Sequence, residues 1–141
     1  MKEVDKNNLP ATIICPDAFI KSPAANFDGV FDWSWTQGCF GNTKIKPMDI
    51  NGLIERNNQF LIFETKDSGV AIPQGQLITL DRLWKTGPFT IMLIWGKRSP
   101  EYFEYWPAYS ANRFRYYGVD EAIEVVKKWF EWADNLNNER R

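Results

Sequence analysis

Two strand-like runs joined by Asn57 and Asn58 constrain this chain more than any other feature. The first run covers residues 53–56 and the second begins at residue 59. Asn tolerates a positive φ, so the Asn pair predicts a two-residue hairpin turn. In that register Asn51 faces Glu64 and Asp49 faces Lys66. A three-residue turn is the alternative, and it would set Asp49 opposite Asp67.

The second run changes abruptly from apolar residues 60–63 to Glu64-Thr65-Lys66. Side chains alternate along a strand, so Glu64 and Lys66 share one face and Thr65 points to the other. A carboxylate and an ammonium at the end of a buried strand are costly unless they pair or bind an ion. With Asp49 on the same face, the carboxylates suit a hard cation such as Mg²⁺. Metal-activated water of that kind cleaves phosphodiesters.

The bland alternative is that Glu64 and Lys66 form an ordinary solvated pair. Two features of the sequence favour the functional interpretation. The Glu-x-Lys pattern occurs once in the chain, and it follows directly on an apolar run rather than lying on an exposed amphipathic face.

The chain contains no histidine. This excludes Ser-His-Asp and Cys-His nucleophile systems, His-ligated zinc sites and nucleases with a histidine general base. Hydrolytic chemistry in this chain must therefore depend on carboxylates, lysine and a metal ion.

Charge and length limit the class of protein further. The net charge is −1, from 17 basic and 18 acidic residues, which argues against tight nonspecific DNA binding. The 141 residues predict a single domain, 1–141. No run approaches the roughly 20 apolar residues of a membrane span, and residues 1–6 lack an apolar signal region. We therefore expect a cytoplasmic protein without a membrane partner, in the host cytoplasm if it is phage-encoded. Cys15 and Cys39 have no metal-type spacing and are predicted to be buried and reduced.

The spacing of apolar residues, together with the positions of Gly and Pro between the apolar segments, predicts an α/β (α+β) fold. We expect a mixed central sheet of about four to five strands flanked by helices. The expected elements are a short apolar segment at 12–15, a short helix from Pro16, a strand at 31–35, the hairpin, a helix at 76–85, a buried central strand at 89–95, an outer strand at 101–106 and a helix at 120–136. The second of these helices should bury Leu77, Leu80, Leu83 and Trp84. The last should begin at an N-cap, Asp120, and bury a stripe that includes Trp129 and Trp132.

The hairpin and the helix after it resemble the PD-(D/E)XK nuclease superfamily over residues 45–95. Asp49 matches the first acid, with Pro47-Met48-Asp49 as a loose form of the Pro-Asp element, and Glu64-Thr65-Lys66 matches the second element. Gln76, or less closely Gln74, matches a Gln that several branches carry at the start of the next helix. The pattern is closest to small nucleases of phages and mobile elements, including virus-type replication-repair nucleases and junction resolvases. It departs from them in Asn51, where a second acid is expected, and in the choice of an upstream acid, which stays open between Asp17, Asp28 and Asp32.

The resemblance implies a metal-dependent deoxyribonuclease. Asp49, Glu64 and the Thr65 carbonyl would hold Mg²⁺, with Mn²⁺ as the alternative ion. Lys66 would orient or deprotonate the attacking water, or stabilise charge on the phosphate; the sequence leaves these roles open. Gln76 would position water or substrate.

Candidate substrate contacts surround this site. They are Lys44, Lys46, Asn51, Arg98, Arg113 and Arg115. The two last arginines lie in a stretch with Phe114, Tyr116 and Tyr117 that we expect to be a loop, and such mixtures suit phosphate contact and base stacking. An ordinary solvated loop is the alternative. The expected partner is DNA, whether single-stranded, duplex or branched, and a homodimer is also compatible.

Two other functions stay open at this stage. One is a catalytically inactive nucleic-acid- or protein-binding module on the same fold, and the other is a phage accessory structural protein. The sequence does not separate endonuclease from exonuclease action, or DNA from RNA.

Overall fold

A computed structural model of the chain describes residues 32–139. The chain divides into two compact units, 1–49 and 50–141, and each is described by itself. The predicted segment at 12–15, the helix from Pro16, and the residues Cys15, Asp17 and Asp28 lie outside the described part.

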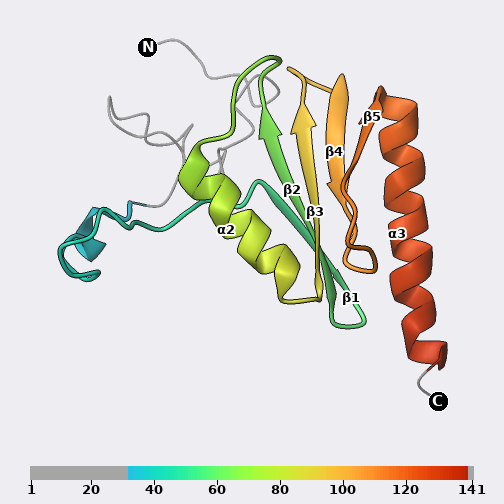
Figure 1. Ribbon diagram of the computed structural model, residues 1–141, viewed down its shortest axis with the longest axis horizontal. Coiled ribbons are helices and arrows are strands. Elements are labelled where there is room, and N and C mark those ends of the chain that lie inside the picture. Colours follow the sequence, from blue (N-terminus) through green and yellow to red (C-terminus); the bar gives the residue numbers. More distant parts are fainter. Residues whose placement is uncertain (1–31, 140–141) are drawn as a thin grey trace, which may run out of the picture. The chain divides into compact units, whose positions relative to one another are not determined.

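The second unit is built on a five-stranded sheet in the order β1-β2-β3-β4-β5 (Figure 1). Its strands are β1 (Gly52–Arg56), β2 (Gln59–Lys66), β3 (Phe89–Trp95), β4 (Tyr102–Trp106) and β5 (Phe114–Tyr117). β2 and β3 are parallel, and the other neighbours are antiparallel. Two helices, α2 (Gln74–Lys85) and α3 (Val119–Glu139), complete the unit. The mixed sheet with flanking helices confirms the predicted fold class.

The predicted hairpin is also confirmed. Asn57 and Asn58 have φ values of 52° and 67°, as a two-residue turn of this kind requires. The register pairs Arg56 with Gln59 and Gly52 with Phe63, where the ladder ends. The alternative three-residue turn is therefore wrong.

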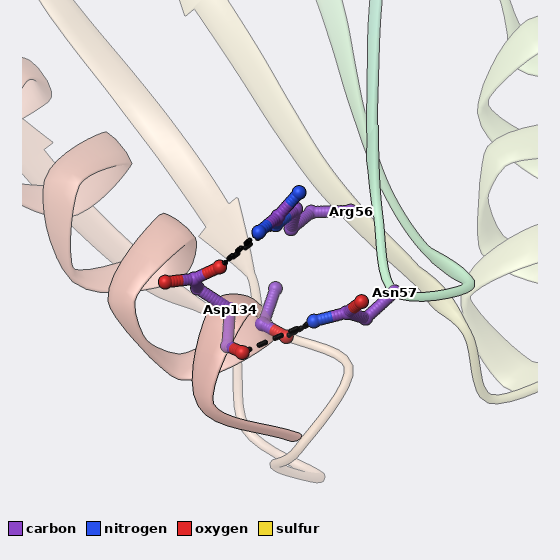
Figure 2. Close-up of polar contacts among 4 residues, drawn as sticks. Arg56, Asn57 and Asp134 are labelled. Atoms are coloured by element: carbon purple, nitrogen blue, oxygen red, sulfur yellow. Dashed lines mark hydrogen bonds and ion pairs between the residues drawn. The ribbon is translucent and has the colours of Figure 1, made fainter. Parts of the chain in front are cut away.

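The hairpin turn is attached to α3 (Figure 2). Arg56 Nε donates a hydrogen bond of 2.8 Å to Asp134 Oδ1. The Asn57 side-chain amide donates to the backbone carbonyls of Ala133 and Asp134, at 2.9 and 3.1 Å. The amide thus ties the tip of the hairpin to helix residues far along the chain.

Exchanging each turn residue for glycine should separate the two roles of Asn57. Glycine tolerates positive φ, so Asn58→Gly should leave the free energy of unfolding nearly unchanged. Asn57→Gly keeps the turn but loses both amide hydrogen bonds to α3, and should cost about 1–2 kcal/mol more. Urea denaturation of the two variants measures the difference. Equal stabilities would contradict a stabilising role for the Asn57 amide.

The two helices cover opposite faces of the sheet. Tyr105 belongs to the cluster that packs against α3, whereas the next residue, Trp106, lies with its ring centroid 5.8 Å from that of Trp84 on α2. Because neighbouring strand residues point to opposite faces, each helix has its own side of the sheet. The α3 cluster buries Leu61, Met92, Phe103, Tyr105, Ala122, Val125, Trp129 and Ala133. The predicted placement of Trp129 in the core is confirmed.

Three predictions about this unit are wrong in detail. β4 is an interior strand rather than an outer one, because the stretch that we expected to be a loop forms the edge strand β5. Leu77 was predicted to be buried but is 37% exposed. Of the four predicted residues of α2, Leu80 is buried, and Leu83 and Trp84 are half-buried. The start of α2 at Gln74 agrees with the predicted start at about Gln76, and its end at Lys85 is as predicted. Asp120 is not the N-cap of α3, because the helix already includes Val119.

In the first unit, the described residues 32–49 contain one short helix, η2 (Ser34–Thr36), in place of the predicted strand at 31–35. Local hydrogen bonds explain the difference, since such bonds compete with strand pairing. The Asp32 carboxylate accepts the Ser34 backbone N–H at 3.0 Å, and this bond lowers the pKa of Asp32. The Thr36 hydroxyl donates to the Trp33 carbonyl at 2.7 Å. Cys39 is exposed, so its predicted burial is also wrong.

Among residues 32–139, no helix combines the length and the apolar character that crossing a membrane requires.

Candidate functional site

The centre of the candidate site is the carboxyl end of β2. Glu64 is buried, with a side-chain exposure of 4%, and Lys66 on the same face is 25% exposed. The Lys66 Nζ atom lies 3.7 Å from Glu64 Oε1. Thr65 is exposed between them, as strand alternation requires. The predicted carboxylate–ammonium pair therefore exists at the end of a buried strand, on the face that α2 covers.

Asn51 fixes the backbone at this point. Its Oδ1 atom accepts the Thr65 backbone N–H at 3.0 Å and lies 3.4 Å from the Thr65 hydroxyl. The pairing of the two hairpin strands is thus continued by a side chain just beyond the last ladder pair, Gly52 and Phe63. In this structure Asn51 orients the strand end that carries Glu64 and Lys66, and its contact with substrate stays a prediction.

The connection from β2 to β3 places the start of α2 at the same end of the sheet. β2 and β3 are parallel, so the chain leaves the carboxyl end of β2, turns at Asp67–Val70 and enters α2 there before returning (Figure 1). Gln74 is the first residue of α2 and is exposed, while Gln76 is the third and is half-buried. Ligand sites in sheets with parallel strands gather outside the carboxyl ends of those strands. Both glutamines therefore occupy the helix start that the sequence predicted.

The turn after β3 belongs to this end as well. Gly96 donates its backbone N–H to the Lys66 carbonyl at 3.0 Å, which joins the turn to the end of β2. A Cβ atom on Gly96 would lie 2.0 Å from the Ser99 carbonyl oxygen, so only glycine fits this position. Lys97 and Arg98 follow in the turn and are exposed.

Three predicted site residues belong to the first unit. They are Asp49, Lys44 and Lys46, and all three are exposed. Together with Trp33 and Phe40 they line one open pocket with a volume of about 530 Å³. The first acid and two predicted phosphate contacts thus share a cavity. The approach of Asp49 to Glu64 stays a prediction, because the two carboxylates belong to separate units.

The predicted donors are all oxygen atoms, which a hard divalent cation prefers. Among residues 32–139, no group of three or more Asp, Glu or Cys side chains gathers for an ion. The predicted set needs only two carboxylates and one backbone carbonyl, because Mg²⁺ retains several waters in most protein sites. Glu64 supplies a buried carboxylate at a strand end, and Asp49 an exposed one.

The two arginines of the β5 region have different surroundings. Arg113 forms an ion pair with Asp81 of α2, and its guanidinium carbon lies 4.5 Å and 3.7 Å from the ring centroids of Trp84 and Trp106. Arg113 therefore packs α2 against the sheet, and its contact with substrate stays a prediction. Arg115 is exposed and forms no such ion pair within the described residues.

Asp81 should give this packing contact a pH dependence. The Lys85 ammonium, at 2.8 Å, holds the pKa of Asp81 below its ordinary value of 3.8 against the opposing effect of desolvation, and the Arg113 guanidinium lowers it further. The stabilising contribution is present above that ordinary value and is lost as the pH falls through the lower folded pKa. Between pH 5 and pH 2, Asp81→Asn should therefore lose less stability than the wild type does. Thermal unfolding across that range measures it, and parallel pH profiles would contradict the assignment.

Sequence reasoning missed one acidic residue near the site. Glu104 of β4 pairs with Leu93 of β3, which in turn pairs with Glu64, so both glutamates lie on the α2 face. Glu104 is half-buried, and its Oε1 atom accepts the Trp106 indole N–H at 3.4 Å. The alternation of residues 101–106 placed Glu104 on a strand, but the order of the strands could not be read from it.

Comparisons with protein family models, with curated proteins and with solved structures found no match for this chain.

Proposed function

We propose that this chain is a divalent-metal-dependent nuclease of the PD-(D/E)XK type that hydrolyses phosphodiester bonds in DNA. The observation that supports this most is the pairing of Glu64 with Lys66 at the carboxyl end of β2. A buried carboxylate is costly to keep charged, and a chain gains little stability from such a pair compared with apolar packing. Its position at the rim of the sheet, next to a helix start and two exposed basic residues, suits a reaction site.

Each residue of the proposed site has a role that follows from the chemistry of its side chain. Asp49, Glu64 and the Thr65 carbonyl would hold Mg²⁺ or Mn²⁺ through oxygen atoms. Such an ion lowers the pKa of a bound water and polarises a phosphoryl oxygen. Lys66, next to Glu64, can orient or deprotonate the attacking water or stabilise charge on the phosphate. Gln76 can hydrogen-bond to water or substrate from the start of α2.

A cleavage assay tests the proposal. The purified chain is incubated with linear duplex, single-stranded, nicked and branched DNA, in Mg²⁺, in Mn²⁺ or in EDTA. We expect cleavage of at least one of these DNAs with metal and none with EDTA. Binding without cleavage in both metals would instead support the inactive binding module, and neither binding nor cleavage would support a structural protein.

A further inference from the structure

Strand alternation in β5 divides its residues between the two faces of the sheet. Arg115 pairs with Glu104 and Tyr117 pairs with Tyr102, so both lie on the α2 face with Lys66. Phe114 and Tyr116 point to the other face, where Tyr116 packs against the α3 cluster. Only Arg115 and Tyr117 of β5 are therefore placed to meet a ligand at the candidate site.

Tyr117 ends the register row that starts at Lys66, and Arg115 ends the neighbouring row that starts at Glu64. One register row across the sheet contains Lys66, Trp95, Tyr102 and Tyr117. Neighbouring strands are about 4.8 Å apart, so the row extends about 14 Å from Lys66 to the edge of the sheet at Tyr117. The centre of the row is covered, because the Trp95 indole N–H donates to the Val70 carbonyl at 2.7 Å and the Tyr102 hydroxyl accepts the Gly69 backbone N–H at 3.1 Å. A ligand therefore meets this face at its β5 edge.

In the neighbouring row, where Arg115 pairs with Glu104, the Arg115 guanidinium is held in place without being neutralised. Its carbon lies 4.9 Å from the ring centroid of Tyr102 and 5.8 Å from that of Trp95, and these two rings are stacked at 5.1 Å. Glu104 faces Arg115 across the strands, but its carboxylate contacts the Trp106 indole instead. Unlike Arg56 and Arg113, Arg115 has no carboxylate partner in the described part of the chain. A planar guanidinium fixed on aromatic rings is a preorganised phosphate ligand.

Tyr117 supplies the complementary surface. It is 67% exposed on the edge strand and has no ring contact with another described residue. An exposed aromatic ring next to a basic residue suits the stacking of an unpaired base.

We propose that an unpaired strand of nucleic acid lies along the β5 edge of the α2 face, with one phosphate on Arg115 and a base stacked on Tyr117. The inference builds on the proposed function, since it names the substrate class as nucleic acid with a single-stranded segment. A duplex keeps its bases stacked on each other, so the ring of Tyr117 selects against it.

Binding without cleavage tests this. Fluorescence anisotropy in EDTA measures the affinity for a labelled oligothymidylate of about 15 nucleotides and for a blunt duplex, at several salt concentrations. We expect the wild type to prefer the single strand. Tyr117→Ala should weaken that binding roughly tenfold, whereas Tyr117→Phe should bind as the wild type does. Arg115→Ala should lower the slope of log K against log salt by about 0.7, and Arg115→Lys should retain it.

Two matched controls complete the design. Arg82→Ala removes an exposed arginine of α2, and Tyr109→Ala removes a tyrosine whose ring packs on Trp132 of α3; both should bind as the wild type does. Three results would each overturn the inference. They are wild-type affinity in folded Tyr117→Ala and Arg115→Ala, equal affinity of the wild type for the duplex and the single strand, and no binding of the oligothymidylate. Because the ring of Tyr117 contacts no other ring among residues 32–139, its variants decide the question even if Arg115→Ala loses its fold. Cleavage with metal in a chain whose Tyr117 variants bind normally would leave the proposed function standing, whereas Tyr117-dependent binding without cleavage would leave the inference standing.

Discussion

Glu64→Gln should reduce metal-dependent cleavage by several orders of magnitude while the chain remains folded. Glutamine has the shape of glutamate but lacks the charge that holds a cation. Each tenfold loss of rate corresponds to about 1.4 kcal/mol of transition-state stabilisation, so losing an ion that activates water costs several such factors. Lys66→Ala should have an effect of similar size, because its ammonium lies 3.7 Å from Glu64 Oε1 at the same strand end.

The measurement is the rate of cleavage of whichever DNA the wild type cuts best, with circular dichroism to verify folding. Glu131→Gln and Lys128→Ala are matched controls, because both residues are exposed on α3, which covers the other face of the sheet. Both controls should cut as the wild type does. A folded Glu64→Gln or Lys66→Ala protein with wild-type activity would remove the assignment of the site.

Trp129→Ala should produce the largest loss of stability. Trp129 is 1% exposed in the centre of the α3 cluster, where the helix meets the sheet. Truncating a buried tryptophan leaves a large cavity and typically costs about 3–5 kcal/mol. That is a large share of the roughly 5–15 kcal/mol by which a native domain is stable, so much of the protein should be unfolded at 37 °C.

The neighbouring residue provides the control. Phe130 is 47% exposed, and the Arg56 guanidinium carbon lies 5.8 Å from its ring centroid. Phe130→Ala should therefore cost less than about 1 kcal/mol. Chemical denaturation compares the two variants, and equal losses would show that α3 does not hold the sheet through Trp129.

The hairpin could be predicted from the sequence because its information is local. Asn57 and Asn58 fix the turn, the turn fixes the register, and the register places Glu64 and Lys66 on one face. The helices at 74–85 and 119–139 were found because their apolar residues recur with the helical period. The buried strand β3 was found because it is continuously apolar.

The predictions are wrong where tertiary contacts or local side-chain hydrogen bonds determine the structure of a segment. The sequence of residues 114–117 resembles a polar aromatic loop. The strand that these residues form is only four residues long, so the alternation of buried and exposed side chains is too short to recognise. The pattern Phe31-x-Trp33-x-Trp35 has a strand period, but the Asp32 carboxylate and the Thr36 hydroxyl close a short helical turn instead. The roles of Arg113 and Arg115 could not be separated from the sequence, because the fold alone brings Asp81, Trp84 and Trp106 to Arg113, whereas Arg115 lies on Tyr102 and Trp95.

The candidate site divides in the same way. Glu64, Lys66 and the glutamines at the start of α2 follow from the hairpin and the parallel connection to β3. Asp49 lies before the first ladder pair, in the segment that ends the other unit, so backbone pairing does not carry it to Glu64. Whether both carboxylates serve one ion is therefore the central claim about this protein.

Binding of Mn²⁺, followed by electron paramagnetic resonance, tests that claim most directly. It compares the wild type with Asp49→Asn, Glu64→Gln and the double variant. If the two carboxylates share one ion, each single change should weaken binding strongly, and the double change should weaken it by less than the sum of the two, because the shared site is already lost. Wild-type affinity in Asp49→Asn, or strictly additive losses, would contradict the shared site.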